Sequence, residues 1–545
     1  MLSKDSVDVS TEYGTIRGCK KVSVLGRNYF NFQRIPYMKP PVGKLRFVDP
    51  QEPEKWTEPL DCTEHGPAFC NVNFLTEQYE GELDSMHVNV YTVDMDPKKP
   101  LPVMVWIHGG GVYTGNARTE LTSPDYLMQK DVVLVTFHYR MGVFGFLSLD
   151  DPSLNIPGNA QFRDHVFALK WIKRNIGRFG GDANNVTVFG ESWGGGSTSY
   201  HMISKQSKNL FHRGILMSGT ALNGVYSLIP RRDWALRLCH QLGYDGSSDD
   251  KSLLEFLENA DEKEIILASP KIMTDKEQEE EGLIVPFGPC IEPYDNGNAF
   301  ITDHIIKMAK NCWGNEIDIM IGATSNELGA LDMMANVESE FKKYINFKRY
   351  IPFDLGIDVD DPKRSEYAER IMRNYYGLLQ PSRSNLEGTM RAGNDFALWH
   401  PIHRIVKSRE NSGKGGKSFV YRFDFNSENN FFKKLAKAED TSREAFHGDD
   451  VGYIFKMDLL GPTPPVDSVG FAGIRLMLST LTEFARTGNP NVNEFENVEW
   501  LPATFDVPLK GLNINEKQSK FIVLPEATTV HALDKLYHEQ KKDLY

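Results

Sequence analysis

A serine flanked by glycines is the first feature of this sequence that could carry chemistry. Residues 190–194 read Gly-Glu-Ser-Trp-Gly, which puts Ser192 at the centre of a G-x-S-x-G pattern. About 0.2 such matches arise by chance in a chain of this length, so the pattern alone is weak. An apolar run precedes it, and a glycine-rich segment that can open a helix follows it. A serine on such a strand-to-helix turn stands exposed above a sheet, where it can act as a nucleophile.

A second glycine-rich segment lies upstream of this serine. Residues 108–111 read His-Gly-Gly-Gly and directly follow the apolar run 101–107. Glycines let backbone N–H groups converge on one point, as an oxyanion hole requires. A phosphate loop or a plain loop is the alternative, but no G-K-S/T follows, so a Walker-type site is poorly supported. Finding both motifs, each directly after an apolar run, is much less probable by chance than finding either one alone.

The elements that must position these motifs are short apolar runs separated by helical patterns. The runs do not alternate, which is typical of strands buried on both faces of a parallel sheet. They cover residues 101–107, 132–137, 186–189, 214–217 and 317–321, with a helical pattern over 159–176. Residues 7–35 alternate apolar and polar and predict antiparallel strands at an edge. The sequence therefore predicts an α/β fold with a large, mostly parallel sheet and a small antiparallel N-terminal sheet.

Length and composition bound the organisation of the chain. Its 545 residues would suggest three or four domains, but it has no internal repeat and no long linker. We therefore expect one domain over residues 1–545 with helical insertions, the main one at 230–310. Six cysteines are scattered without a CxxC pair, which excludes a disulfide scaffold and fits no zinc spacing. Free, buried thiols are the expected state.

Charge and hydropathy exclude several classes of partner. The formal net charge is −13 and no basic stripe is present, so nucleic acid is not an expected partner. No apolar run approaches the roughly 20 residues of a membrane span. The first residues lack the apolar region of a secretory signal, and the last five, KKDLY, match neither a retention signal nor a prenylation box. The expectation is a cytoplasmic protein without a membrane anchor.

Taken together, the motifs resemble the type-B carboxylesterase/cholinesterase family, and within it most closely the intracellular alpha-esterases of insects. The resemblance runs over nearly the whole length. It rests on residues 32–37 (FQRIPY), 40–47 (PPVGKLRF), 108–111 (HGGG), 139–147 (YRMGVFGFL), 157–159 (PGN), 179–182 (FGGD), 190–195 (GESWGG) and 217–219 (MSG). It implies an α/β-hydrolase fold and ester hydrolysis.

The resemblance also implies the partners of Ser192. The family's acid follows a strand, and here Glu327 ends the matching segment 322–327. The family's histidine precedes an acidic residue, a tyrosine and a bulky residue, and His447 stands in that place. Without the resemblance, none of the fourteen histidines could be chosen, and His400 or His403 would be equal candidates. The order Ser, Glu, His is the order of α/β-hydrolases.

A mechanism follows by role from this assignment. His447 would accept the proton of Ser192, and Glu327 would orient the imidazole and stabilise its charged form. Backbone N–H groups would hold the oxyanion, and the expected donors are Gly110, Gly111 and Trp193. No metal or cofactor is expected to take part. Arg140 and Asp164 match family positions that form an internal ion pair.

The chain departs from the family pattern beside the nucleophile. Trp193 stands where alanine is usual, so a large ring is expected next to Ser192, where it could narrow the site or slow turnover. Val112 replaces the usual aromatic residue after HGGG and could widen the other side. Tyr226, Phe287 and Phe396 are further candidates for the pocket lining, although aromatic residues are at least as often plain core.

Three other departures concern the backbone and the cysteines. Leu328 follows the acid where a glycine is usual, and Arg34 replaces a glycine that a tight turn would favour. Ser85 stands where secreted members carry a cysteine. The resemblance then implies that Cys62 or Cys70 lacks its usual disulfide partner, which agrees with a reducing compartment.

The leading hypothesis is a carboxylesterase that acts on small, uncharged aliphatic or aryl esters. The resemblance implies that organophosphates or carbamates would inhibit it by modifying Ser192, and a role in insecticide detoxification is the expectation that follows. A slow-turnover protein that sequesters such compounds is one alternative. A catalytically silent cholinesterase-like binding protein is another, but such members usually lack a triad residue. The oligomeric state is left open.

Overall fold

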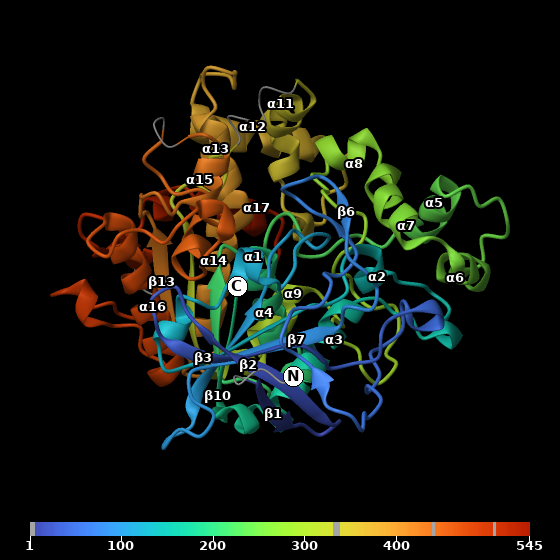
Figure 1. Cartoon of the computed structure of the whole chain (residues 1–545). Coiled ribbons are helices and arrows are strands. Elements are labelled where there is room, and N and C mark those ends of the chain that lie inside the picture. The colour runs from blue at the N-terminus through green and yellow to red at the C-terminus, as the bar shows by residue number, and fades with distance from the viewer. Residues whose placement is uncertain (1–5, 331–337, 439–441, 505–507) are drawn as a thin grey trace.

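A computed structural model describes residues 6–330, 338–438, 442–504 and 508–545 of the chain. Within these residues, 13 strands form one sheet in the order β1-β2-β3-β7-β9-β8-β10-β11-β12-β13-β14-β15, with β4 beside β2 (Figure 1). The strands are β1 (Ser6–Ser10), β2 (Thr15–Val22), β3 (Asn28–Pro36), β4 (Leu60–Asp61), β7 (His87–Thr92), β8 (Leu101–Ile107), β9 (Val133–Phe137), β10 (Gly181–Glu191), β11 (Arg213–Met217), β12 (Asp318–Thr324), β13 (Ser418–Phe423), β14 (Lys510–Ile514) and β15 (Lys520–Val523).

The centre of the sheet is parallel and its two edges are antiparallel. Strands β9, β8, β10, β11, β12, β13 and β14 pair in parallel. Strands β1, β2, β3 and β7 are antiparallel to their neighbours along the path to β9, and β15 is antiparallel to β14. The predicted N-terminal strands therefore extend the large sheet, and the separate small sheet is β5 (Asn71–Val72) with β6 (Tyr79–Glu80).

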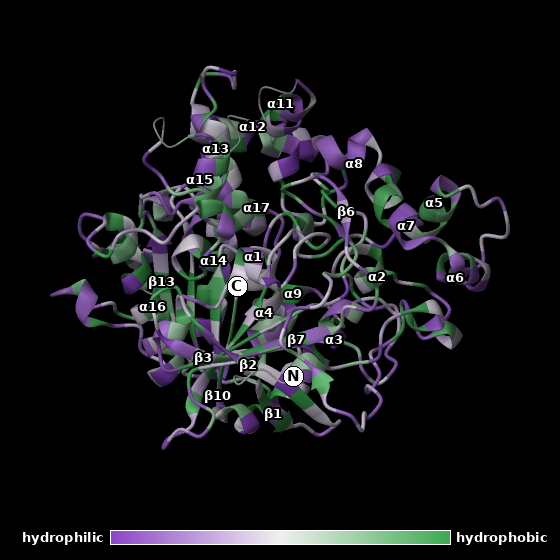
Figure 2. Cartoon of the chain, viewed as in Figure 1, coloured by the Kyte–Doolittle hydropathy of each residue, from purple (hydrophilic) through white to green (hydrophobic). Residues whose placement is uncertain are grey.

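Both faces of the central strands are buried, which explains why the sequence shows apolar runs without alternation. Val103, Val105 and Ile107 of β8 enter one hydrophobic core, while Met104 and Trp106 enter the core on the other face. Successive side chains of a strand point to opposite faces, so a strand between two cores must be apolar at every position. Figure 2 shows the hydrophobic residues gathered on these inner strands.

Helices cover the two faces. Residues of α3 and α4 join the first core, and residues of α16 join the second. Helices α5 to α8 lie to one side, and α11 to α13 gather at the top in Figure 1. The helices described are α1 (Thr119–Thr122), α2 (Gly142–Phe146), α3 (Ala160–Asn175), α4 (Trp193–Ile203), α5 (Trp234–Gln241), α6 (Asp250–Asn259), α7 (Glu262–Ala268), α8 (Asp275–Glu279), α9 (Ile305–Lys310), α11 (Glu338–Ile345), α12 (Pro362–Tyr376), α13 (Glu387–Asn394), α14 (His400–Asn411), α15 (Phe431–Leu435), α16 (Val469–Thr487) and α17 (His531–Glu539).

A buried ion pair joins Arg140 to Asp164 of α3, as the family resemblance implies. The guanidinium of Arg140 donates to both carboxylate oxygens of Asp164, with N···O distances of 2.6 and 2.8 Å, and neither side chain is exposed. Arg140 also donates to the carbonyl oxygens of Arg46 and Val48. The carboxylate of Asp164 compensates the positive charge of Arg140, which would be costly to bury without a partner.

Two composition-based expectations bear on the cysteines and on membranes. All six cysteines lie in the described residues and none is bonded to another; five are buried and Cys19 is partly exposed. Among the helices of the described ranges, none combines the length and apolar character that crossing a bilayer requires.

Candidate active site

Ser192 sits on the sharp turn between β10 and α4. Its backbone has φ 57° and ψ −121°, a conformation that residues other than glycine rarely adopt. A β-carbon on Gly194 would clash with the carbonyl oxygen of Ile107, and one on Gly219 would clash with that of Ser192. The glycines are therefore required because neighbouring backbones pass in direct contact. The turn fixes Ser192 at the carboxyl end of β10, above the sheet.

Glu327 and His447 meet at the same edge of the sheet. Glu327 lies just beyond β12, and Oε2 of its carboxylate is hydrogen-bonded to Nδ1 of His447. The other oxygen, Oε1, accepts hydrogen bonds from the hydroxyl of Ser218 (2.7 Å) and the backbone N–H of Thr324 (2.6 Å). The carboxylate is 1% exposed, so these three contacts fix its position. This arrangement orients the imidazole of His447 through Nδ1 and leaves Nε2 available for a proton transfer.

Nε2 of His447 faces Glu191, the residue before Ser192. It lies 3.2 Å from Oε1 of Glu191, and in the described part of the chain no hydrogen bond joins it to Ser192. His447 and Ser192 nevertheless line the same two cavities. Hydrogen bonds between a nucleophile and its base are often loose before substrate binds. The resting imidazole thus lies between two carboxylates.

The pKa values of these groups are strongly linked. Burial alone would lower the pKa of His447, but the carboxylates of Glu191 and Glu327 outweigh it and raise this pKa. Burial raises the pKa of Glu191 to about 7, although His447 opposes the shift. Burial also favours protonation of Glu327, but the contact with His447 and the hydrogen bonds lower its pKa overall. Near neutral pH Glu327 is therefore ionised, and the imidazole of His447, whose pKa rises to about 10, is protonated in the resting site.

The glycine loop after β8 passes beside Ser192. Gly110 and Gly111 have φ values of 117° and 62°, which favour glycine. A β-carbon on Gly109 would lie 3.2 Å from Cβ of Ser192, so the loop and the nucleophile are adjacent. Trp193 is the first residue of α4, where N–H groups have no partner within the helix. The three predicted oxyanion donors are thus on segments that flank Ser192.

Two cavities open on either side of Ser192 and share Tyr226 and His447. One has a volume of about 220 Å³ and is lined mainly by apolar side chains, among them Phe396 and Leu398. The guanidinium of Arg349 also borders it and stacks on the ring of Tyr344 at 4.7 Å. The other cavity has a volume of about 300 Å³ and holds the glycine loop. A molecule bound across Ser192 could extend into both.

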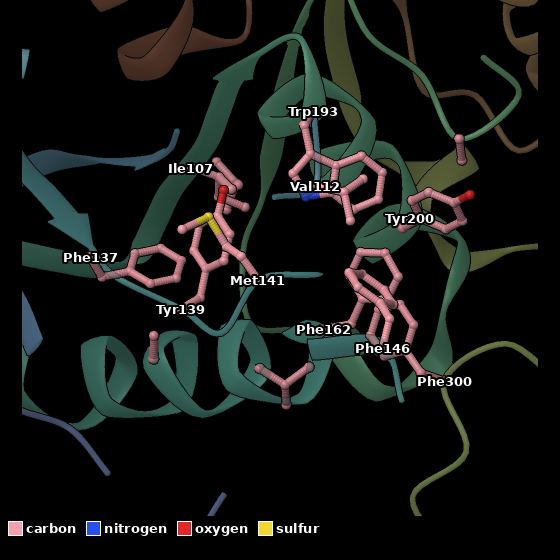
Figure 3. Close-up of a cluster of buried hydrophobic side chains, with 14 of the residues drawn as sticks. Ile107, Val112, Phe137, Tyr139, Met141, Phe146, Phe162, Trp193, Tyr200 and Phe300 are labelled. Carbon is pink, nitrogen blue, oxygen red and sulfur yellow. The ribbon is translucent and has the colours of Figure 1, made fainter. Parts of the chain in front are cut away.

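Three expectations about the pocket are wrong. The ring of Trp193 lines neither cavity; its side chain packs among Phe146, Phe162 and Tyr200 and is 2% exposed (Figure 3). Val112 is fully buried in the same core, although it adopts an unusual φ of 83°. Phe287 borders a separate small cavity lined by Phe146 and Trp234. Tyr226 and Phe396 do lie in the cavity lining.

The other departures have local explanations. Arg34 adopts φ 62°, so the strained turn that favours glycine is present here without one. Leu328 takes part in the cavity wall, and its N–H donates to Oδ1 of Asn394 at 2.8 Å. This hydrogen bond holds the backbone directly after Glu327.

Three further residues contact or anchor the groups at the site, and the sequence motifs did not predict their roles. Glu191 and Ser218 stood inside the quoted motifs, but the contacts of their side chains depend on strands that meet only in the fold. Asp449 was visible two residues after His447; its carboxylate accepts hydrogen bonds from the backbone N–H groups of Phe446, Phe432 and Lys433 at 2.7, 2.8 and 3.1 Å. Asp449 thereby anchors the loop that carries His447. The alternative histidines, His400 and His403, lie on α14 and do not line either cavity.

Comparison with known proteins identifies the family and the fold. The chain matches the model of the carboxylesterase family over residues 5–533. It is 35% identical to esterase B1 of Culex pipiens over 540 residues, 98% of this chain and 99% of that protein. It is 31% identical to juvenile hormone esterase of Tribolium castaneum, over 92% of this chain and 86% of that one. A crystal structure of juvenile hormone esterase from Manduca sexta with OTFP covalently attached superposes with a TM-score of 0.85 at 26% identity, covering 98% of this chain and all of that one.

Proposed function

The chain belongs to the carboxylesterase family and is an ester hydrolase, and from that premise we propose that it works through Ser192, His447 and Glu327. The observation that carries the proposal is the hydrogen bond between Glu327 and His447 at the cavity that also exposes Ser192. A serine on a strained turn, a histidine and a buried carboxylate converge there. This is the set of groups that acyl transfer to a serine requires.

The steps follow from the atoms in place. Oγ of Ser192 attacks the ester carbonyl carbon as its proton passes to Nε2 of His447. The N–H groups of Gly110, Gly111 and Trp193 stabilise the oxyanion. The ester C–O bond breaks, and the proton on Nε2 passes to the leaving alcohol. Water then gives a proton to His447 and attacks the acyl carbon, which releases the acid and returns the proton to Ser192.

Glu191 has a place in this cycle because its ionised carboxylate favours a proton on Nε2 of His447. Burial raises the pKa of Glu191 to about 7, and a neutral Glu191 no longer stabilises that proton, so Nε2 can then offer the lone pair that the attack needs. Once the imidazolium forms, Glu327 stabilises its charge through Nδ1. The reaction uses only protein groups and water.

The substrate class we propose is small, uncharged aliphatic or aryl esters. The walls of both cavities are mostly apolar, with Phe396 and Leu398 in one and Phe74, Phe432 and Met457 in the other. Apolar walls favour uncharged groups because a charged group would lose hydration without a partner. Organophosphates and carbamates would modify the same serine. A role in insecticide detoxification follows from such modification of Ser192 and belongs to this proposal.

A pre-steady-state assay with chromogenic acetate and butyrate esters tests the proposal. Steady turnover that disappears in Ser192→Ala would support it. A choline ester of the same acyl chain serves as the charged control and should be turned over much more slowly. A single-equivalent burst followed by little turnover would favour the slow-turnover alternative, and absence of any acylation would favour the binding-protein alternative.

A further inference from the structure

A cluster of histidines and an aspartate lies between α14 and α17, outside both cavities that border Ser192. His400 and His403 are three residues apart on α14, and His531 and Asp534 are three residues apart on α17. A spacing of three puts two side chains on one helix face. The two pairs face each other, because Nε2 of His400 is hydrogen-bonded to Oδ1 of Asp534 at 2.9 Å.

Three of these residues have the geometry of a metal site. One ligand atom from each of His403, His531 and Asp534 can be chosen so that all lie within 4.8 Å of one another. Nδ1 of His531 is 2.9 Å from Oδ2 of Asp534, and the hydroxyl of Tyr545 is 3.4 Å from Nε2 of His403. His400 holds the second carboxylate oxygen, which is the outer contact that orients ligating side chains in metal sites.

One ring nitrogen of the cluster has no partner among the described residues. Nδ1 of His403 is buried without a hydrogen-bond partner in the described part of the chain. His403 is 3% exposed, and a buried polar atom normally has a partner. An imidazole nitrogen of this kind is one of the ligand atoms that zinc accepts.

We propose that His403, His531 and Asp534 bind a zinc-like divalent transition-metal ion, with a fourth position for water. Two imidazoles and one carboxylate are a ligand set that zinc accepts in tetrahedral geometry. The side chain of His531 is 56% exposed, which gives the ion a path from solvent. The positive charges of Arg404 and Lys407 disfavour a cation nearby. The guanidinium of Arg404 is, however, paired with the carboxylate of Asp354 at 2.8 Å.

The ion would tie two helices together rather than enter the reaction. Helix α14 continues directly from residues 395–399, which include Phe396 and Leu398 of the cavity wall. Binding to the folded state alone stabilises that state in proportion to the logarithm of the free ion concentration. We therefore expect zinc to raise the unfolding temperature and to leave ester hydrolysis possible in its absence.

Cobalt titration of the chelator-treated full-length protein tests this site, since cobalt replaces zinc and absorbs visible light when four-coordinate. The wild type should bind one equivalent and lose its colour when zinc is added. His531→Gln removes an exposed ligand and should weaken binding by at least about tenfold. The matched control is His538→Gln, an exposed histidine two turns along α17, which should bind like the wild type.

Thermal unfolding gives a second reading of the same variants. Zinc should raise the midpoint of the wild type and of His538→Gln, but not that of His531→Gln. No binding of cobalt at micromolar concentration would overturn the proposal. Binding of equal strength in His531→Gln would also overturn it, because the ion would then occupy other ligands, such as those around His447. Ester hydrolysis by the chelated wild type, measured alongside, keeps this result separate from the proposed function.

Discussion

Nε2 of His447 lies 3.2 Å from Oε1 of Glu191, the residue directly before Ser192. Glu191 is 7% exposed, so its carboxylate acts on the imidazole through little intervening solvent. His447 therefore stands between two carboxylates, one that orients it through Nδ1 and one that faces its reactive nitrogen. The pH dependence of hydrolysis should report this second contact.

Glu191→Gln removes that charge and should lower the pKa of His447. An opposite charge at this distance raises a pKa by roughly 1–3 units, so the acidic limb of kcat/KM should move to lower pH by a shift of that order. A pH profile over pH 4–9 measures it. The exposed glutamate in Glu58→Gln provides the control and should leave the profile unchanged. An unmoved profile in Glu191→Gln would show that Glu191 does not govern the base.

Ser218→Ala removes one hydrogen-bond donor from Glu327. A hydrogen bond to a charged group contributes about 1.5–3 kcal/mol, so kcat/KM should fall by roughly ten- to hundredfold. The loss should appear in kcat, because Glu327 acts mainly on the charged imidazole of the transition state. Ser408→Ala, a buried serine on α14 whose hydroxyl has no partner within the described residues, is the control. A change confined to KM would argue against this positioning role.

Trp193→Ala should lower stability without altering the balance of acylation and deacylation. The ring fills a core position, so its removal should cost about 3–5 kcal/mol in the free energy of unfolding. The backbone N–H of residue 193 is retained, so the oxyanion contact persists. Thermal unfolding of the wild type and the variant tests the loss of stability. The burst amplitude, measured well below the unfolding midpoints of both proteins, tests the balance of acylation and deacylation. Faster deacylation in the variant would mean that the ring does obstruct the site.

Asp164→Asn should destabilise the fold strongly. It leaves the fully buried Arg140 without its counter-charge, and breaking such a pair costs about 3–5 kcal/mol. Asp8→Asn breaks the pair of Asp8 with Arg17, whose side chains are 44% and 28% exposed, and should cost less than about 1 kcal/mol. Denaturant unfolding of both variants gives the comparison. Equal losses of unfolding free energy in the two variants would show that burial of the Arg140–Asp164 pair does not increase its contribution to stability.

Much of the parallel centre could be predicted from sequence. The run 101–107 coincides with β8, and the predicted helix 159–176 overlaps α3 (Ala160–Asn175) almost completely. Such elements are recognisable because a strand between two cores is apolar throughout. The joining of the N-terminal strands to the large sheet was not visible, since the pairing of β3 with β7 depends on hydrogen bonds between distant segments.

The site was only partly readable. The glycine motifs around Ser192 and Gly110 are visible in the sequence, because a larger residue at these positions would clash with a neighbouring backbone. The direction in which the side chain next to such a glycine points cannot be predicted from the sequence. Trp193 and Val112 therefore proved to be core residues. The choice of His447 depended wholly on family likeness. The single domain over residues 1–545 and the cytoplasmic location stay predictions.

If Ser192 forms a covalent bond with substrate, an organophosphate should modify the same oxygen, and peptide mass spectrometry of the treated protein locates the adduct. We expect one phosphoryl group on the peptide that contains Ser192, loss of esterase activity in step with its formation, and no adduct in Ser192→Ala. An adduct on another residue, or full activity in Ser192→Ala, would contradict this role of Ser192.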